Sequence, residues 1–164
     1  GHKHAAGVST AKDDLQAWAL RRRESFEELL KQDRSVTYRK VHVATLTKNA
    51  VADVKEMLTK EQPTAVFAVT DHLAAAVYLA ADQLNLRIPA DLSVVGFGDL
   101  DFSCHQMPPL TTVRQRSKEV GRQAARIVVD RIEGVIEDAT PVGIRVGADF
   151  MVRHSSGPPP DRTS

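Results

Sequence analysis

Few side chains in this chain of 164 residues stand in a pattern that could support catalysis. Asp99 and Asp101 are two carboxylates close together in the sequence, as general acid-base chemistry requires. Aspartates in such a segment are far more typical of turns and helix caps. Cys104 has no arginine or lysine near it in the sequence to favour the thiolate, so we expect a packed or interface cysteine.

Metal and cofactor motifs are also missing from the sequence. The six histidines show no HExxH motif and no other paired metal-ligand spacing. The run Gly96-Phe97-Gly98 begins like a dinucleotide-binding motif, but Asp101 stands where the third glycine is required, and a loop follows instead of a helix. There is no phosphate-loop motif and no nucleophile elbow. We therefore expect no metal, no cofactor and no enzymatic activity.

Arg22 is the charged residue that stands out, because it lies on the apolar stripe of a predicted helix. We expect Asp13 or Asp14 to cap this helix, which should run to about Lys31. The other residues of the stripe are Leu15, Trp18, Ala19, Phe26, Leu29 and Leu30. An inward arginine either binds an anion or extends its head group to solvent, and both interpretations stay open. The run 21–23 makes a poor nucleic-acid patch, since its side chains point to three sides of a helix.

The strands and helices that position these residues are organised around residues 63–98. Two continuous apolar runs, 64–69 and 92–97, predict strands that are buried on both faces, as in a parallel sheet. The helix between them begins at Asp71 and carries apolar residues at spacings of three and four up to Leu84. The segment is therefore a βαβ unit.

Further elements are predicted on both sides of this unit. We expect strands at 4–9, 41–46, 110–114 and within 140–152, helices at 48–60 and 118–133, and an irregular loop at 98–109. Ser117 can cap the second of these helices, and Gly134 ends it. The order predicts an open, mostly parallel α/β sheet with helices on both faces. Ligands of such sheets bind at the carboxyl ends of the strands. Those ends are here 9–10, Thr45, 70–71 and 98–99.

Composition narrows the class of protein. With 22 basic and 21 acidic residues the formal net charge is +1, which gives no whole-chain attraction to nucleic acid or membrane. A single cysteine excludes an internal disulfide and suits the cytoplasm. No apolar run approaches the roughly 18 residues that span a bilayer, and no signal peptide is apparent. The first residues look like a strand of a larger protein, and we expect residues 155–164, rich in proline, to be a disordered tail.

Several ordered motifs together resemble one family. They are PTAVFAVTDHLAAAVYLAADQLNLRIPADLSVVGFGD, then PPLTTVRQ, then Gly121 and Ala125, then FMVRHSS, with GHKHAA at the start and the helix around Arg22. In this order they resemble the C-terminal half of the LacI/GalR family of bacterial transcription regulators. The resemblance covers nearly all of residues 1–155.

The resemblance implies a periplasmic-binding-protein-like fold, in which a small effector such as a sugar or nucleobase lies in a cleft between two subdomains. Residues 1–154 would form a partial effector-binding domain. Within it we expect the core of the C-terminal subdomain at about 10–113, a crossover helix at about 117–134 and final strands at about 142–153. The DNA-binding helix-turn-helix of the family is not among these residues.

The resemblance also implies which residues bind and which pair. The expected effector-binding residues are Arg22, Thr70, Asp71, His72, Gly98, Asp99 and Gln115. The expected homodimer interface contains Leu73, Val77, Cys104, His105 and Gln106. The sequence departs from the family at Gly98, where an aspartate commonly holds effector hydroxyls, so that Asp99 would have to replace it. Ser25 also stands where the family has glycine.

The implied function is ligand-gated control of transcription. Effector would close the cleft, rotate the subdomains and change the spacing of the DNA-binding heads on the operator. A solute-binding protein of a sugar transport system is the alternative function. An enzyme on the same kind of sheet is a third hypothesis, but the sequence contains no set of catalytic residues for it. In the family the helix after PPLTTVRQ packs on the first subdomain. We therefore expect its stripe to repack on this chain's own sheet, to swap with a neighbour or to be mobile. The stripe contains Val120, Ala124, Ile127, Val128 and Ile132.

Overall fold

The structure is a computed structural model that describes residues 1–10, 17–33, 35–43, 48–137 and 141–160. Its strands are β1 (His4–Thr10), β2 (Thr37–Val43), β3 (Ala65–Ala68), β4 (Ser93–Gly98), β5 (Thr111–Gln115) and β6 (Ala148–Met151). Its helices are α1 (Ala17–Gln32), α2 (Lys48–Glu61), α3 (Asp71–Gln83), α4 (Ser117–Ile132) and the short 3-10 helix η2 (Asp101–His105). No helix within these ranges is long and apolar enough to cross a membrane.

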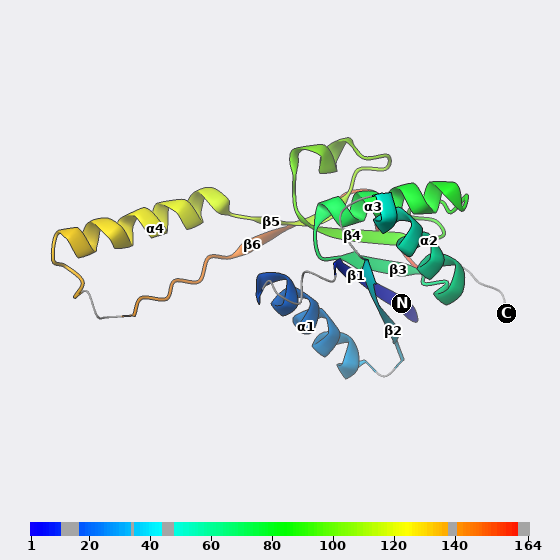
Figure 1. Cartoon of the computed structure of the whole chain (residues 1–164), viewed down its shortest axis with the longest axis horizontal. Coiled ribbons are helices and arrows are strands. Elements are labelled where there is room, and N and C mark those ends of the chain that lie inside the picture. Colours follow the sequence, from blue (N-terminus) through cyan, green and yellow to red (C-terminus); the bar gives the residue numbers. More distant parts are fainter. Residues whose placement is uncertain (11–16, 34, 44–47, 138–140, 161–164) are drawn as a thin grey trace.

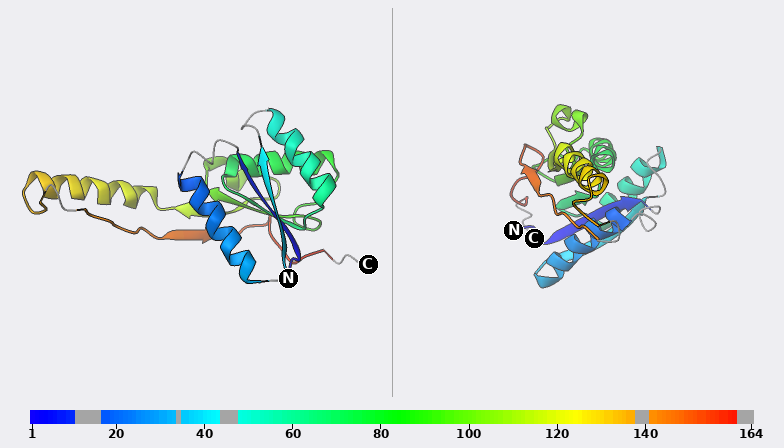
Figure 2. Two further views of the ribbon diagram at one scale, coloured as in Figure 1. Left: turned by 60° about the horizontal axis from the view of Figure 1, so that its bottom comes forward. Right: turned by 90° about the vertical axis from the view of Figure 1, so that its left-hand side faces the viewer.

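The strands form one sheet in the order β2-β1-β3-β4-β5-β6. All neighbouring pairs are parallel except β5 and β6, which are antiparallel. Helix α1 covers one face, and α2 and α3 lie side by side on the other (Figures 1 and 2). The predicted open α/β sheet with helices on both faces is confirmed. The carboxyl ends of the parallel strands meet along one edge, where loops and helix N-termini converge.

The core lies between the sheet and the two helices α2 and α3, which cover one of its faces. Its largest fully buried side chains include Leu73 of α3, Leu92 and Val94 at β4, and Leu110 before β5. Burying a leucine or valine side chain contributes roughly 1.5–3 kcal/mol to folding. The continuous apolar runs of the βαβ unit were therefore a reliable guide to the centre of the fold.

Strand β2 begins four residues before its predicted start at Val41, and the predicted residues 44–46 lie outside the described ranges. It is an edge strand that pairs only with β1, and only Val43 of it is fully buried. Charged residues such as Arg39 and Lys40 are typical of sheet edges, and they dilute the apolar pattern there. Tyr38 anchors the strand, since its ring packs edge to face on Phe26 of α1 with ring centroids 5.8 Å apart.

Helix α4 extends away from the sheet, and none of its residues is buried (Figure 1). The expectation that its apolar stripe repacks on this chain's own sheet is therefore wrong. Val120, Val128 and Ile132 are exposed. Swapping and mobility stay predictions. The predicted Ser117 cap is also wrong, because the N-cap residue is Arg116 and no side chain caps the helix.

The expected disordered tail is wrong for residues 155–157. Ser155 is fully buried between two strands, where its Oγ donates to Val94 O at 2.6 Å and accepts from Thr111 N at 2.7 Å. Gly157 O accepts a hydrogen bond from His2, so that the segment after β6 returns along the sheet to the first residues of the chain. A hydroxyl can replace a strand partner in this way, and proline-rich composition gives no sign of it. Residues 161–164 lie outside the described ranges.

Candidate functional site

Arg22 lies at the carboxyl ends of β3 and β4. Its Nη1 donates to Val69 O at 3.1 Å, and its guanidinium lies 3.7 Å from the ring centroid of Phe97 and 4.4 Å from that of Trp18. The cation is therefore placed between two aromatic faces, which stabilise it by cation–π attraction. Arg22 is half-buried. Its contacts with Val69 and Phe97 place it beside the strand ends, as expected, while its role toward a ligand stays a prediction.

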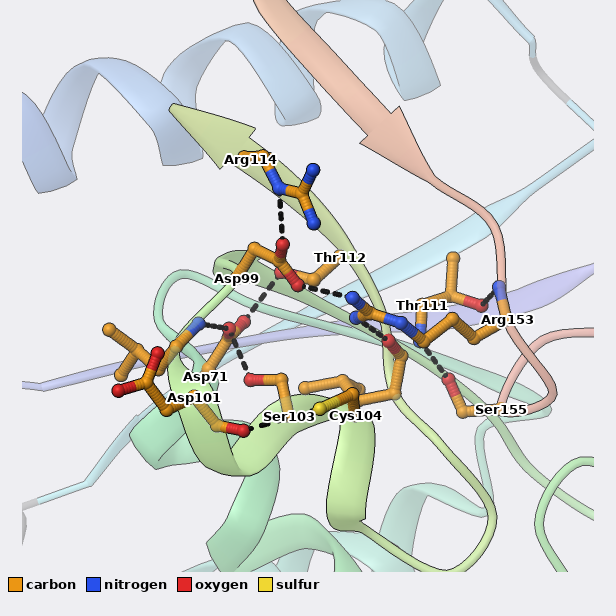
Figure 3. Close-up of polar contacts among 12 residues, drawn as sticks. Asp71, Asp99, Asp101, Ser103, Cys104, Thr111, Thr112, Arg114, Arg153 and Ser155 are labelled. Atoms are coloured by element: carbon orange, nitrogen blue, oxygen red, sulfur yellow. Dashed lines mark hydrogen bonds and ion pairs between the residues drawn. The ribbon is translucent and has the colours of Figure 1, made fainter. Parts of the chain in front are cut away.

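Asp71 is fully buried and accepts three hydrogen bonds. Its Oδ2 accepts from Leu100 N at 2.9 Å and Ser103 Oγ at 2.6 Å, and its Oδ1 accepts from Thr112 Oγ at 2.6 Å (Figure 3). These bonds tie α3 to η2 and β5. The expectation that Asp71 faces an effector is therefore wrong, because its carboxylate is enclosed and has no exposed surface.

The residues around Asp71 explain two features of the sequence. Thr70, not Asp71, is the N-cap of α3, and its Oγ accepts from Leu73 N at 3.3 Å. A β-carbon at Gly96 would lie 2.3 Å from Asp71 Oδ1. The glycine that resembles a dinucleotide motif therefore makes room for a structural carboxylate.

Gly98 and Asp99 form a turn with positive φ angles of 136° and 53°. This conformation favours glycine at position 98 and directs the Asp99 carboxylate toward β5. Asp99 Oδ1 accepts from Arg153 Nη2 at 2.6 Å, and Oδ2 accepts from Arg114 Nε at 2.5 Å (Figure 3). Burial alone would raise the pKa of Asp99. The hydrogen bonds from Arg153 and Arg114 lower the pKa by more than burial raises it, so the pKa of Asp99 lies below its ordinary value. We call Arg114, Asp99 and Arg153 the arginine–aspartate triad.

A polar groove of about 840 Å³ lies beside this triad. It is formed by the end of β4, the end of β5, the start of α4 and Asp149 of β6, with the lining residues Gly98–Asp101, Arg114–Glu119 and Arg122. Gln115, predicted to bind effector, lines this groove. Arg22 does not, and lines a separate apolar hollow of about 470 Å³ with Phe67, Phe97 and Val113. The structure thus divides the predicted site into two neighbouring parts.

The predicted dimer residues fall into two groups. Leu73 and Val77 are buried in the core, so they are not available to a partner, and their assignment to the interface is wrong. Cys104 and His105 are exposed on η2, and Gln106 is half-buried. The exposed side of α3 carries His72, whose ring packs on Phe102 with centroids 5.3 Å apart, and Leu79. The apolar stripe assigned from the sequence is the inward one.

The described residues of the site offer hydrogen-bond donors and charges that suit the binding of a polar ligand. Within the described ranges no group of three histidine, cysteine, aspartate or glutamate side chains could hold a metal ion. Cys104 Sγ donates a hydrogen bond to Asp101 O at 3.3 Å. Asp99 is paired with two arginines and Asp101 is exposed, so the two are not arranged as an acid-base pair. Sequence reasoning did not identify Arg114 and Arg153 as site residues. Nothing in the local pattern marks them, because their partner lies far away in the chain.

Comparisons with known proteins give a consistent family. A family model described as a periplasmic binding protein-like domain matches residues 1–156. The chain is 40% identical over 85 residues to the HTH-type transcriptional repressor PurR of Proteus mirabilis, and 37% identical over 89 residues to the ribose operon repressor of Haemophilus influenzae. These matches cover 52% and 54% of this chain but only 25% and 27% of the two relatives.

The fold agrees with these relatives. The crystal structure of a LacI family transcriptional regulator from Bifidobacterium animalis subsp. lactis superimposes with a TM-score of 0.83 and 27% identity. The match covers 97% of this chain and 57% of that one. The 164 residues therefore belong to the periplasmic binding protein-like domain family, and within it to the LacI/GalR regulators, whose effector-binding domain they match in its C-terminal half.

Proposed function

We propose that this chain is the effector-sensing and dimerisation part of a bacterial LacI-type transcriptional regulator. The observation that carries the proposal is the position of Arg22. A guanidinium held between Trp18 and Phe97 at the carboxyl edge of a parallel sheet is well placed to bind a small polar ligand. Its planar donor edge is suited to hydroxyl, carbonyl or anionic oxygens. The effector would be sugar-like or nucleobase-like.

The proposed mechanism involves no bond chemistry. Effector would bind between this sheet and a second subdomain, and closure would shift the population of the dimer between two arrangements. Operator DNA would be bound by a helix-turn-helix outside these residues. Such a regulator works in the cytoplasm. The relatives described above are named as repressors, which supports this function over solute transport or catalysis.

A ligand screen on the intact gene product tests the effector site. Sugars, sugar phosphates and nucleobases are added one by one, and the shift in melting temperature is measured. We expect one class to stabilise the protein, and we expect Arg22→Met to reduce this shift because the donor edge is lost. The matched control is Arg87→Met, since Arg87 is exposed and precedes β4 at the opposite edge of the sheet. Equal shifts in both variants would contradict the role of Arg22.

The proposed dimer surface is the exposed side of α3 together with η2. Leu79 and Met107 are exposed apolar side chains there, 56% and 89% accessible. Sedimentation of the intact protein should show a dimer that Leu79→Lys weakens. Leu29→Lys, on the exposed face of α1, serves as the control because Leu29 is similarly exposed at 65%. A dimer insensitive to Leu79→Lys would place the interface elsewhere.

A further inference from the structure

Arg114, at the end of β5, is held from one side only. Its Nε donates to Asp99 Oδ2 at 2.5 Å, and the side chain is 48% exposed. Within the described ranges its two terminal nitrogens have no partner, and Arg114 lines the polar groove. An arginine that is fixed through Nε presents the paired terminal N–H groups that bind a carboxylate or phosphate in bidentate geometry.

The arginine–aspartate triad carries an excess positive charge. Asp99 is one carboxylate shared by two guanidinium groups, since Arg153 Nη2 donates to its other oxygen. Arg153 is fixed in turn by a hydrogen bond from Nη1 to Leu110 O at 2.8 Å. The Asp99 side chain is only 6% exposed, so solvent screens its contacts with the two guanidinium groups less than on an open surface. Arg114 is the exposed member of the triad, and Asp149 on the groove wall is another carboxylate close enough to feel its charge.

Among the described residues, the rest of the groove supplies one further cation that has no ion-pair partner. Lys118 in the first turn of α4 is exposed and has no ion-pair partner within the described ranges. Arg116 is paired with Asp149, and Arg122 with Glu119. Asp101 also lines the groove, as an exposed carboxylate with no ion-pair partner in the same ranges. A ligand would therefore place its anionic end toward Arg114 and Lys118 and its hydroxyl or neutral end toward Asp101.

We propose that the polar groove binds an anionic group of the effector, a phosphate or a carboxylate, and that Arg114 selects for it. The inference rests on the proposed function in that it names the chemical class of the effector. Gly98 fits this class. Position 98 has no side chain, and the next carboxylate, Asp99, is directed to the two arginines. Repulsion of an anionic ligand by a free carboxylate at this position is thereby avoided.

The test titrates the 164-residue chain with inorganic phosphate, and separately with acetate, at constant ionic strength. Backbone amide NMR shifts report binding. We expect saturable shifts at residues 99 and 114–119, and at least a tenfold weaker affinity in Arg114→Gln, because a charge-assisted bidentate contact is lost. Arg114→Lys should be intermediate, since it keeps the charge but loses the planar fork. Arg87→Gln, at the opposite edge of the sheet, should bind like the parent chain.

The two anions distinguish the two sources of the charge. Tighter binding of phosphate would indicate a phosphorylated effector, and tighter binding of acetate a carboxylic acid. Shifts that rise linearly without saturation, or equal affinity in Arg114→Gln and the parent chain, would overturn the inference. The titration is independent of regulation. If the groove binds phosphate through Arg114 while no ligand alters operator binding by the intact protein, the groove stands and the proposed function fails.

Discussion

Removal of the Asp71 carboxylate should be among the most destabilising single changes in this chain. Asp71→Ala deletes an acceptor of three hydrogen bonds and leaves Leu100 N, Ser103 Oγ and Thr112 Oγ without it. Ser103 and Thr112 are fully buried, so water does not readily take its place. Hydrogen bonds to a charged group contribute about 1.5–3 kcal/mol each. Their simple sum is an upper bound, because neighbouring bonds are not additive.

We expect Asp71→Ala to lower the free energy of unfolding by about 4 kcal/mol, a loss that few single substitutions cause. Asp71→Asn should lose about 1–2 kcal/mol, since an amide keeps one acceptor and the Thr112 hydroxyl can reorient to accept. Asp82→Ala is the matched control, because Asp82 is an exposed aspartate on the same helix, and it should stay within about 0.5 kcal/mol of the parent chain.

Urea unfolding followed by far-ultraviolet circular dichroism measures these differences. Ser103→Ala removes only one of the donors, and it provides a measurement if Asp71→Ala does not fold. It should cost about 1–2 kcal/mol, and less in an Asp71→Asn background, because the two changes share a partner. A loss below about 1 kcal/mol for Asp71→Ala would refute the idea that this carboxylate joins α3 to β5.

Three further changes test other parts of the structure. Burial raises the pKa of Tyr78 to about 12. Burial and the nearby Glu27 carboxylate also raise the pKa of Tyr38. The stability that the two phenols contribute is therefore fully present below their ordinary pKa of 10.0. It should be lost as the pH rises from 10 toward 12, and tyrosinate absorbance should appear at higher pH in the folded than in the urea-unfolded chain. Gly96→Ala should cost about 1–3 kcal/mol in urea unfolding, because the added methyl group meets Asp71. Val128→Lys on exposed α4 should change the stability of this chain by less than about 0.5 kcal/mol, and a larger loss would mean that the helix is packed in solution.

The fold could be predicted from the sequence where strands are buried on both faces. The runs that form β3 and β4 are mostly apolar, and the helix between them has a regular inward stripe, so local pattern and tertiary environment agree there. The start of strand β2 was predicted too late because an edge strand has little apolar pattern to display. The segment around Ser155 was misassigned because one buried hydroxyl and two backbone partners fix it, and composition does not report such bonds.

The site could be predicted only in part, because its charges are paired over long distances in the chain. Arg22 was recognisable, since a cation on an apolar stripe stands out against its neighbours. Asp99 was identified as a residue of the strand end, but its partners Arg114 and Arg153 are 15 and 54 positions away. No periodic pattern connects them. The resemblance to a family located the site correctly at the carboxyl ends of the strands. It did not predict which charged residues pair with each other there.

The pairing changes what the edge can recognise. Two aspartates, Asp71 and Asp99, were expected to face the effector. In the structure the first holds helix α3 against β5, and the second holds Arg153 in place and orients Arg114. Arg22 and Gln115, two of the predicted effector-binding residues, remain accessible to a ligand, and so does the neighbouring Arg114. Because donors outnumber acceptors among these groups, ligand selectivity at this edge depends on how many acceptor or anionic oxygens a ligand offers. Charge reversal at an exposed donor should therefore change ligand preference, whereas neutralising a buried aspartate should instead lower stability.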